Sequence, residues 1–134
     1  MDPKTLIQKH EGFRDRVYLD TEGIPTVGWG HAFIAGSKVS REICEMLFES
    51  DYAVACRDYT TLGLTLNPVR RSVIINMLFN LGLPRFLGFR KMIDALRKGD
   101  YSQAAAEMCD SKWAKQVGSR ADNLAEMMRT GKDL

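Results

Sequence analysis

The chain of 134 residues has little of what would place it in a specialised class of protein. It holds only three cysteines, Cys44, Cys56 and Cys109, an odd number with no close pair. This argues against a disulfide framework and against a CxxC metal site. Because all three fall in helix-like stretches, we expect buried free thiols.

No long hydrophobic run is present either. The longest apolar patch, residues 73–83, is interrupted by Asn76 and Asn80 and is too short to cross a bilayer. The first residues, MDPKTLIQKH, lack the apolar core of a signal peptide. We therefore expect a soluble cytoplasmic product without a transmembrane segment. If its target lies outside the membrane, a separate protein would have to release it.

An excess of charge of one sign is also missing. The net charge is +2 and the sequence pI is about 8.5, too weak a bias to predict nucleic-acid binding. A mildly positive surface would still favour approach to an anionic polymer such as a bacterial wall. The hydrophobic share of 45% and the charged share of 27% are typical of a globular domain.

The first third of the chain predicts one short helix and a β-hairpin. Asp2-Pro3 is an N-cap followed by a first-position proline, and Gly12 can end the helix. Two β-prone runs, residues 17–19 and 24–28, flank an acidic turn that ends in glycine, which is typical of a hairpin. We expect residues 32–38 to form a loop.

The rest of the chain predicts helices, each marked by a cap residue or by apolar spacing. Ser40 is an N-cap candidate, Asn67-Pro68 repeats the pattern of the first helix, and glycines mark the ends. Three expected helices cover residues 40–58, 68–81 and 90–98. A fourth is opened by a capping box at 100–103, and a fifth is opened by a capping box at 119–122 and closed by Gly131. We expect a connector at 60–66 and a break at 84–88.

Two carboxylates in the first segment are candidates for catalysis. Glu11 lies at the end of the first predicted helix, where the partial negative charge of the helix disfavours an ionised carboxylate and favours the proton-carrying form. Asp20 begins a turn whose backbone N–H groups can stabilise its negative charge. One proton donor beside one base is the pairing needed for glycoside cleavage. Taken alone, such residues are more often solvated or in surface ion pairs.

A resemblance adds to this reasoning. The segment HEGFRDRVYLDTEGIPTVGWGH, residues 10–31, resembles the active-site signature of phage-type lysozymes of the T-even-phage kind, glycoside hydrolase family 24. The family pattern, Glu-x8-Asp-x5-Thr, fits Glu11, Asp20 and Thr26 without a gap. The stretches RRSVIINMLFNLG and SKWAKQVGSRADNLAEMMRTG also match in order, so the resemblance covers nearly the whole chain.

The resemblance implies an α+β, mostly helical, two-lobed fold in one domain. A small β-hairpin lobe, about residues 12–40, would be joined by a helix, about 40–58, to a helical lobe formed by about 59–134 and the N-terminal helix. It also implies Glu11 as the general acid, Asp20 as base or electrostatic stabiliser and Thr26 as the holder of the attacking water, with inversion at the sugar carbon. Between His31 and Ser40 the chain is shorter than the longest family members.

The resemblance further implies sugar contacts at Gly30, Phe79 and Asn80. For Phe79 a place in the core is an equal alternative because of its helical spacing. Gly30 would let the sugar chain approach the backbone closely. Met92 and Glu107 stand where the family can carry polar substrate contacts, and their roles are not transferred.

Three residues are expected to support the site. Arg120 matches a family arginine near the acid, and His31 and Asp51 match positions that can form an ion pair between the hairpin and the long helix. A lone histidine beside one carboxylate predicts neither a zinc site nor a catalytic triad. We expect no metal and no cofactor.

The combined expectation is an endolysin-type muramidase. It would hydrolyse the β-1,4 bond between N-acetylmuramic acid and N-acetylglucosamine in peptidoglycan. The expected state is a monomer that neither binds nucleic acid nor inserts into a membrane and that depends on a separate holin-type protein. The alternatives are a lytic transglycosylase and a catalytically silent wall-binding or virion module.

Overall fold

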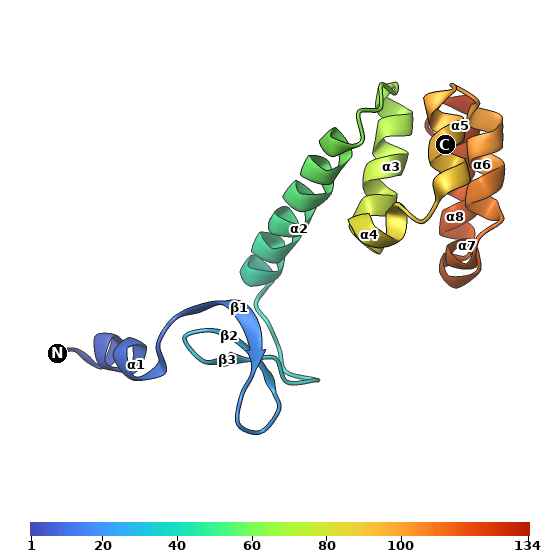
Figure 1. The fold of residues 1–134 in the computed structure, drawn as a ribbon. Coiled ribbons are helices and arrows are strands. Elements are labelled where there is room, and N and C mark those ends of the chain that lie inside the picture. Colours follow the sequence, from blue (N-terminus) through green and yellow to red (C-terminus); the bar gives the residue numbers. More distant parts are fainter. The chain divides into compact units, whose positions relative to one another are not determined.

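The computed structural model describes all 134 residues and divides them into two compact units, Met1–Ile43 and Cys44–Leu134. Eight helices and three short strands follow the chain, with the strands confined to the first unit (Figure 1). The predicted α+β, mostly helical class is confirmed. The expected lobe boundaries, including the assignment of the N-terminal helix to the helical lobe, stay predictions.

The N-terminal unit holds α1 (Pro3–Glu11), β1 (Arg14–Leu19), β2 (Pro25–Gly28) and β3 (His31–Ala32). Helix α1 begins as predicted, because the Asp2 side chain accepts a hydrogen bond of 2.9 Å from the Thr5 N–H. It ends at Gly12, whose N–H donates to the Gln8 carbonyl. The acidic residue predicted at the helix end, Glu11, is its last residue.

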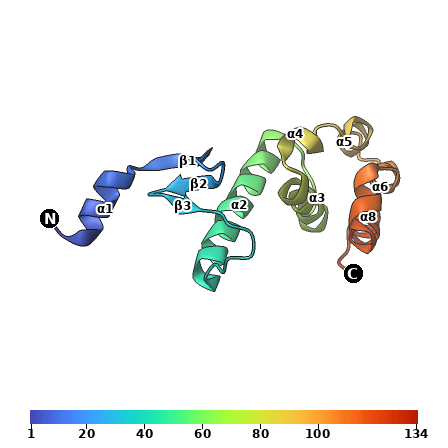
Figure 2. The same cartoon turned by 90° about the horizontal axis from the view of Figure 1, so that it is seen from below.

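The three strands form one antiparallel sheet in the order β1-β2-β3 (Figure 2). Thr26 on the central strand pairs with Tyr18 on one side and Ala32 on the other. The predicted hairpin is therefore present, but β3 was missed. A strand of two residues is too short to produce an alternating pattern that sequence could reveal.

Helix α2 (Arg41–Thr61) begins in the last residues of the first unit and continues into the second. The Ile43 N–H donates to the Ser40 hydroxyl at 3.3 Å, as expected for the predicted N-cap. The other helices are α3 (Pro68–Leu81), α4 (Leu83–Phe86), α5 (Arg90–Arg97), α6 (Tyr101–Cys109), α7 (Lys112–Val117) and α8 (Ser119–Thr130). No helix is both long enough and apolar enough to span a membrane.

The core of the C-terminal unit is built mainly by α3, α5, α6 and α8. Helix α6 packs against both α5 and α8, and α3 packs against α8 (Figure 1). Removal of apolar side chains from water is the main force that holds such helices together. The largest fully buried side chains are Phe86, Ile74, Met77, Met92, Met108, Met128 and Val73.

Two sequence predictions in this unit are wrong, and one helix was missed. Residues 84–88 are not simply a break, because α4 begins at Leu83 with Pro84 in its first turn, where its missing N–H costs nothing. Ser119 does not cap the last helix but is its first residue, after Gly118. The separate helix α7 was missed, although Ser111 caps it by accepting from the Ala114 N–H.

The expectation of buried thiols is also wrong for two cysteines. Cys44 and Cys109 are exposed, whereas Cys56 is half-buried, and all three are free. Cys44 lies in the first turn of α2 and Cys109 is the last residue of α6. Helix ends pack less completely than helix centres, and the spacing of apolar residues could not show this.

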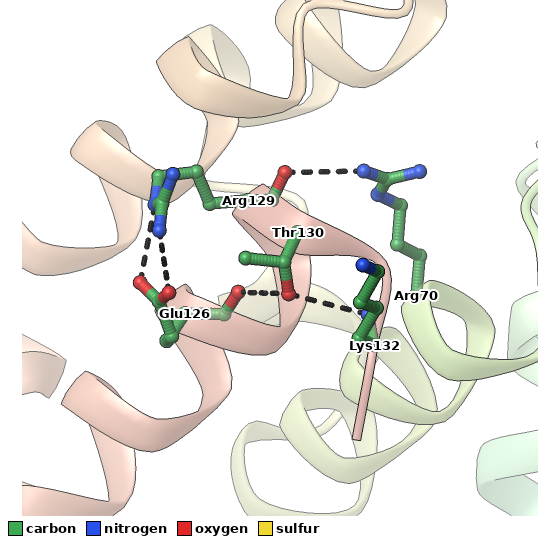
Figure 3. A network of polar contacts seen from close by, with 5 residues as sticks. All are labelled: Arg70, Glu126, Arg129, Thr130 and Lys132. Carbon is green, nitrogen blue, oxygen red and sulfur yellow. Dashed lines mark hydrogen bonds and ion pairs between the residues drawn. The ribbon is translucent and has the colours of Figure 1, made fainter. Parts of the chain in front are cut away.

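A polar network fastens the start of α3 to the end of α8 (Figure 3). Arg70 donates from Nε to the Met128 carbonyl at 2.7 Å and from Nη2 to the Arg129 carbonyl at 3.1 Å. A cation at the carbonyl end of a helix complements the partial negative charge there. The guanidinium also lies 3.7 Å above the Tyr101 ring, a cation–π distance.

Candidate active site

Glu11 and Gly30 meet inside the N-terminal unit. Glu11 ends α1, and Gly30 belongs to the turn between β2 and β3. A β-carbon placed on Gly30 would lie 2.8 Å from Glu11 Oε2. The structure therefore brings the predicted general acid directly against the backbone of the sheet.

Asp20 lies in the turn that connects β1 and β2, as predicted. Its Oδ1 accepts hydrogen bonds from the Glu22 N–H at 2.8 Å and the Ile24 N–H at 2.9 Å. Because both bonds converge on one oxygen, they hold the carboxylate in place relative to the turn.

Thr26 is the one buried polar residue of the protein, with 3% of its surface exposed. Its hydroxyl donates to the Ile24 carbonyl at 2.8 Å. The same carbonyl accepts from the Asp20 N–H at 3.0 Å, so Thr26 and Asp20 share one anchoring point. Since the Thr26 proton is directed to this carbonyl, the hydroxyl oxygen can serve a water only as an acceptor.

The predicted ion pair of His31 and Asp51 joins residues of different units, and it stays a prediction. Within its own unit, His31 packs edge-to-face against Phe33, with ring centroids 5.1 Å apart. Asp51 is an exposed residue of α2.

Phe79 and Arg120 line one recess of the C-terminal unit, with a cavity volume of about 330 Å³. Phe79 is 40% exposed, and its ring lies 5.5 Å from that of Phe48, so it is not a residue of the closed core. Arg120 donates from Nε and from Nη2 to Asn76 Oδ1, at 3.1 and 2.6 Å. The expected nearness of Arg120 to the acid crosses between units and stays a prediction.

Tyr52 lines the same recess from α2. Its hydrogen bond with Cys56 raises the pKa of the phenol above its ordinary value of 10.0, so Tyr52 is a neutral hydroxyl near pH 7. The recess thus combines aromatic faces, one cation and a neutral hydroxyl. Aromatic faces beside polar groups suit a sugar ring, which has apolar faces and hydroxyl edges.

Asn80 has a partner that the sequence did not reveal. Its Oδ1 accepts a hydrogen bond of 2.8 Å from the indole N–H of Trp113, which is 33 positions further along the chain. Trp113 is buried, so this bond satisfies a polar group that would otherwise be costly to remove from water. The proposed sugar contact of Asn80 therefore stands beside a structural role.

A larger recess of the same unit, of about 700 Å³, was missed by sequence reasoning. Met92, Glu107 and Trp113 line it, and a set of basic residues contributes to its wall. A signal was present in the segment PRFLGFRKM, where basic residues flank aromatic ones. The basic lining residues are Arg85, Arg90, Lys91 and Lys112.

The N-terminal unit thus presents one carboxylate at a helix end and a second one held by turn N–H groups. This arrangement is suited to acid–base chemistry. No three His, Cys, Asp or Glu side chains of the structure gather closely enough to hold a metal ion.

Comparison with known proteins gives the class. The family model for phage lysozymes matches residues 8–129, and the chain therefore belongs to the phage lysozyme family. The protein is a lysozyme-like glycoside hydrolase that acts on peptidoglycan.

Individual relatives are similar to most of this chain. A probable T4-type lysozyme 1 of Dictyostelium discoideum is 27% identical over 96% of this chain and 94% of the relative. The endolysin of Acyrthosiphon pisum secondary endosymbiont phage 1 is 31% identical over 82% of this chain and 75% of the relative. The pre-baseplate central spike protein Gp5 of Enterobacteria phage T4 is 30% identical over 98% of this chain but only 28% of the spike protein.

Proposed function

We propose that the protein is a muramidase of the endolysin type, which hydrolyses the β-1,4 bond between N-acetylmuramic acid and N-acetylglucosamine. The observation that supports this most is the placement of Glu11 and Asp20 within one unit, one at a helix end and one held by backbone N–H groups. Bacterial peptidoglycan strands are the substrate.

Glu11 acts as the general acid. It donates its proton to the glycosidic oxygen while the bond between that oxygen and the sugar carbon breaks. The place of Glu11 at the end of α1, next to Gly30 of the turn between β2 and β3, supports this role.

Asp20 and Thr26 act on the water. The water adds to the opposite face of the sugar carbon and loses a proton to Asp20, so one water is consumed for each bond cleaved. Thr26 accepts a hydrogen bond from that water, because its own proton is directed to Ile24. The water's lone pair then faces the sugar, and the product carries the inverted configuration.

Substrate binding extends beyond these three residues. Phe79 and Asn80 are the proposed sugar contacts, and Arg120 is the proposed partner of the acid. We propose a monomer that stays in the host cytoplasm until a separate holin-type protein opens the way to the wall.

The test is clearance of purified peptidoglycan by wild type, Glu11→Gln and Asp20→Asn. We expect losses of about 1000-fold or more for Glu11→Gln and about 100-fold or more for Asp20→Asn, the range of general acid and base contributions. Glu22→Gln is the matched control, since this exposed acid shares the Asp20 turn and should keep activity. Normal clearance by Glu11→Gln would refute the assignment.

The products separate the rival functions. A hydrolase releases reducing ends, whose anomeric configuration is read by NMR immediately after cleavage. Anhydro-muramic ends, detected by mass spectrometry, would assign a transglycosylase instead. The match to a spike protein favours a virion module as the second candidate, and binding to walls with no release of sugar would support it.

A further inference from the structure

Two glycines, one at the end of β2 and one in the turn that follows it, differ in their surroundings. Gly28 and Gly30 both have left-handed backbones, with φ of +69° and +84°. Around Gly28 a β-carbon would meet nothing within 4 Å. At Gly30 it would lie 2.8 Å from Oε2, 3.2 Å from Cδ and 3.7 Å from Cγ of Glu11.

The contact distances decide which of the two partners would move. A separation of 2.8 Å is shorter than real β-carbon contacts, so the smallest side chain at Gly30 forces a shift. The obstructed atoms are the far end of a flexible side chain and not backbone. Rotation of the Glu11 carboxylate would therefore relieve the overlap at little cost to folding.

We infer that Gly30 is a positioning residue that fixes the place of the Glu11 carboxylate by leaving free the space a side chain would fill. The inference rests on the proposed function of Glu11 as the general acid. It differs from the expected role of Gly30, in which the missing side chain admits the sugar chain. Catalysis is sensitive to such placement, because a misplacement of about 1 Å can cost roughly 100-fold in rate.

The experiment compares Gly30→Ala with Gly28→Ala. Both replace a glycine of positive φ, so both force a side chain onto a left-handed backbone, but only Gly30→Ala meets Glu11. We expect equal melting temperatures for the two variants, a loss of about 100-fold in turnover for Gly30→Ala, and less than about threefold for Gly28→Ala. Equal losses in turnover would overturn the inference.

Wall binding separates the positioning role from the sugar-contact role. The Glu11→Gln background removes turnover, so sedimentation with intact purified peptidoglycan measures binding alone. If Gly30 acts through Glu11, adding Gly30→Ala to this background leaves binding unchanged within about twofold. A loss of binding of tenfold or more would assign Gly30 to the sugar contact and overturn the inference.

A third readout needs no activity. In protein carrying carbon-13 at glutamate carboxyls, the Glu11 signal is assigned by its disappearance in Glu11→Gln. Gly30→Ala should shift that signal, whereas Gly28→Ala should not. An unmoved signal overturns the inference whatever the activity. A shifted signal in a protein whose Glu11→Gln variant clears walls normally would keep the contact and reject the proposed function of Glu11.

Discussion

The two units of the protein are fixed by different forces. Every buried apolar side chain lies in the C-terminal unit, where helices pack around Phe86 and its neighbours. In the N-terminal unit the only buried residue is Thr26, and its geometry is set by hydrogen bonds to the main chain. Packing therefore decides the stability of one unit, and local polar contacts decide the placement of candidate catalytic groups in the other.

This difference predicts which substitutions should lower the stability of the protein and which should lower its activity. A cavity in an apolar core lowers stability in proportion to the volume lost, whatever the chemistry of the site. A misplaced carboxylate or hydroxyl lowers the reaction rate, but it changes the buried apolar area very little. The protein also offers one reporter for each unit, since Trp29 belongs to the first and Trp113 to the second.

The largest expected effect on stability is that of Phe86→Ala. Phe86 is fully buried, so its truncation should lower the free energy of unfolding by about 3–5 kcal/mol. Denaturant unfolding followed by Trp113 fluorescence in a Trp29→Phe background measures this. The adjacent Leu87, 46% exposed, is the matched control, and Leu87→Ala should cost less than about 1 kcal/mol. Equal losses would contradict a packing-dominated unit.

Thr26→Val should separate rate from stability in the other unit. The substitution keeps the shape but removes the hydroxyl, and the Ile24 carbonyl retains the Asp20 N–H as a donor. We expect a fall in turnover of about 100-fold, equivalent to about 2.7 kcal/mol in the activation free energy. Thr26→Ser keeps the hydroxyl and should retain most activity. If valine and serine variants are equally active, Thr26 does not hold the water.

Arg70→Met tests a polar contact within the packed unit. The variant loses two hydrogen bonds to the end of α8, of which Figure 3 shows the one to Arg129. Its free energy of unfolding should fall by about 2 kcal/mol. Arg71→Met removes the same charge from the neighbouring exposed position and is the control. Trp113 fluorescence again reports unfolding. Similar losses for both variants would show that charge, not the contacts, matters.

The features that sequence predicted are local. The caps at Asp2, Ser40, Asn67 and Asp100 each accept a hydrogen bond from a backbone N–H three residues ahead, and the Asp20 turn has the predicted donors. Such contacts involve residues a few positions apart, so residue type and spacing are enough to predict them.

The features that sequence missed depend on distant residues or on very short elements. The contact of Glu11 with Gly30, and the bond from Trp113 to Asn80, join positions whose nearness only the folded chain reveals. Elements such as β3 and α4 are too short to show a period. The fold class, the place of Glu11 at a helix end and the hydrogen-bonded turn of Asp20 could therefore be predicted. The nearness of Gly30 to Glu11 could not.

The smallest expected effect is a dependence of α1 on pH. Hydrogen bonds from the Thr5 N–H and hydroxyl hold the pKa of Asp2 below its ordinary value of 3.8. The folded pKa is the lower one, so this contribution to stability is present above the unfolded value and is lost as pH falls through the folded value. Asp2→Asn keeps an acceptor for the Thr5 N–H but cannot titrate.

Carbon-13 chemical shifts of α1, followed from about pH 6 to about pH 2, should show helix fraying in acid for wild type and less for Asp2→Asn. Identical profiles would mean that the cap bond does not govern this helix, and the claim that local polar contacts set the geometry of the N-terminal unit would lose its simplest example.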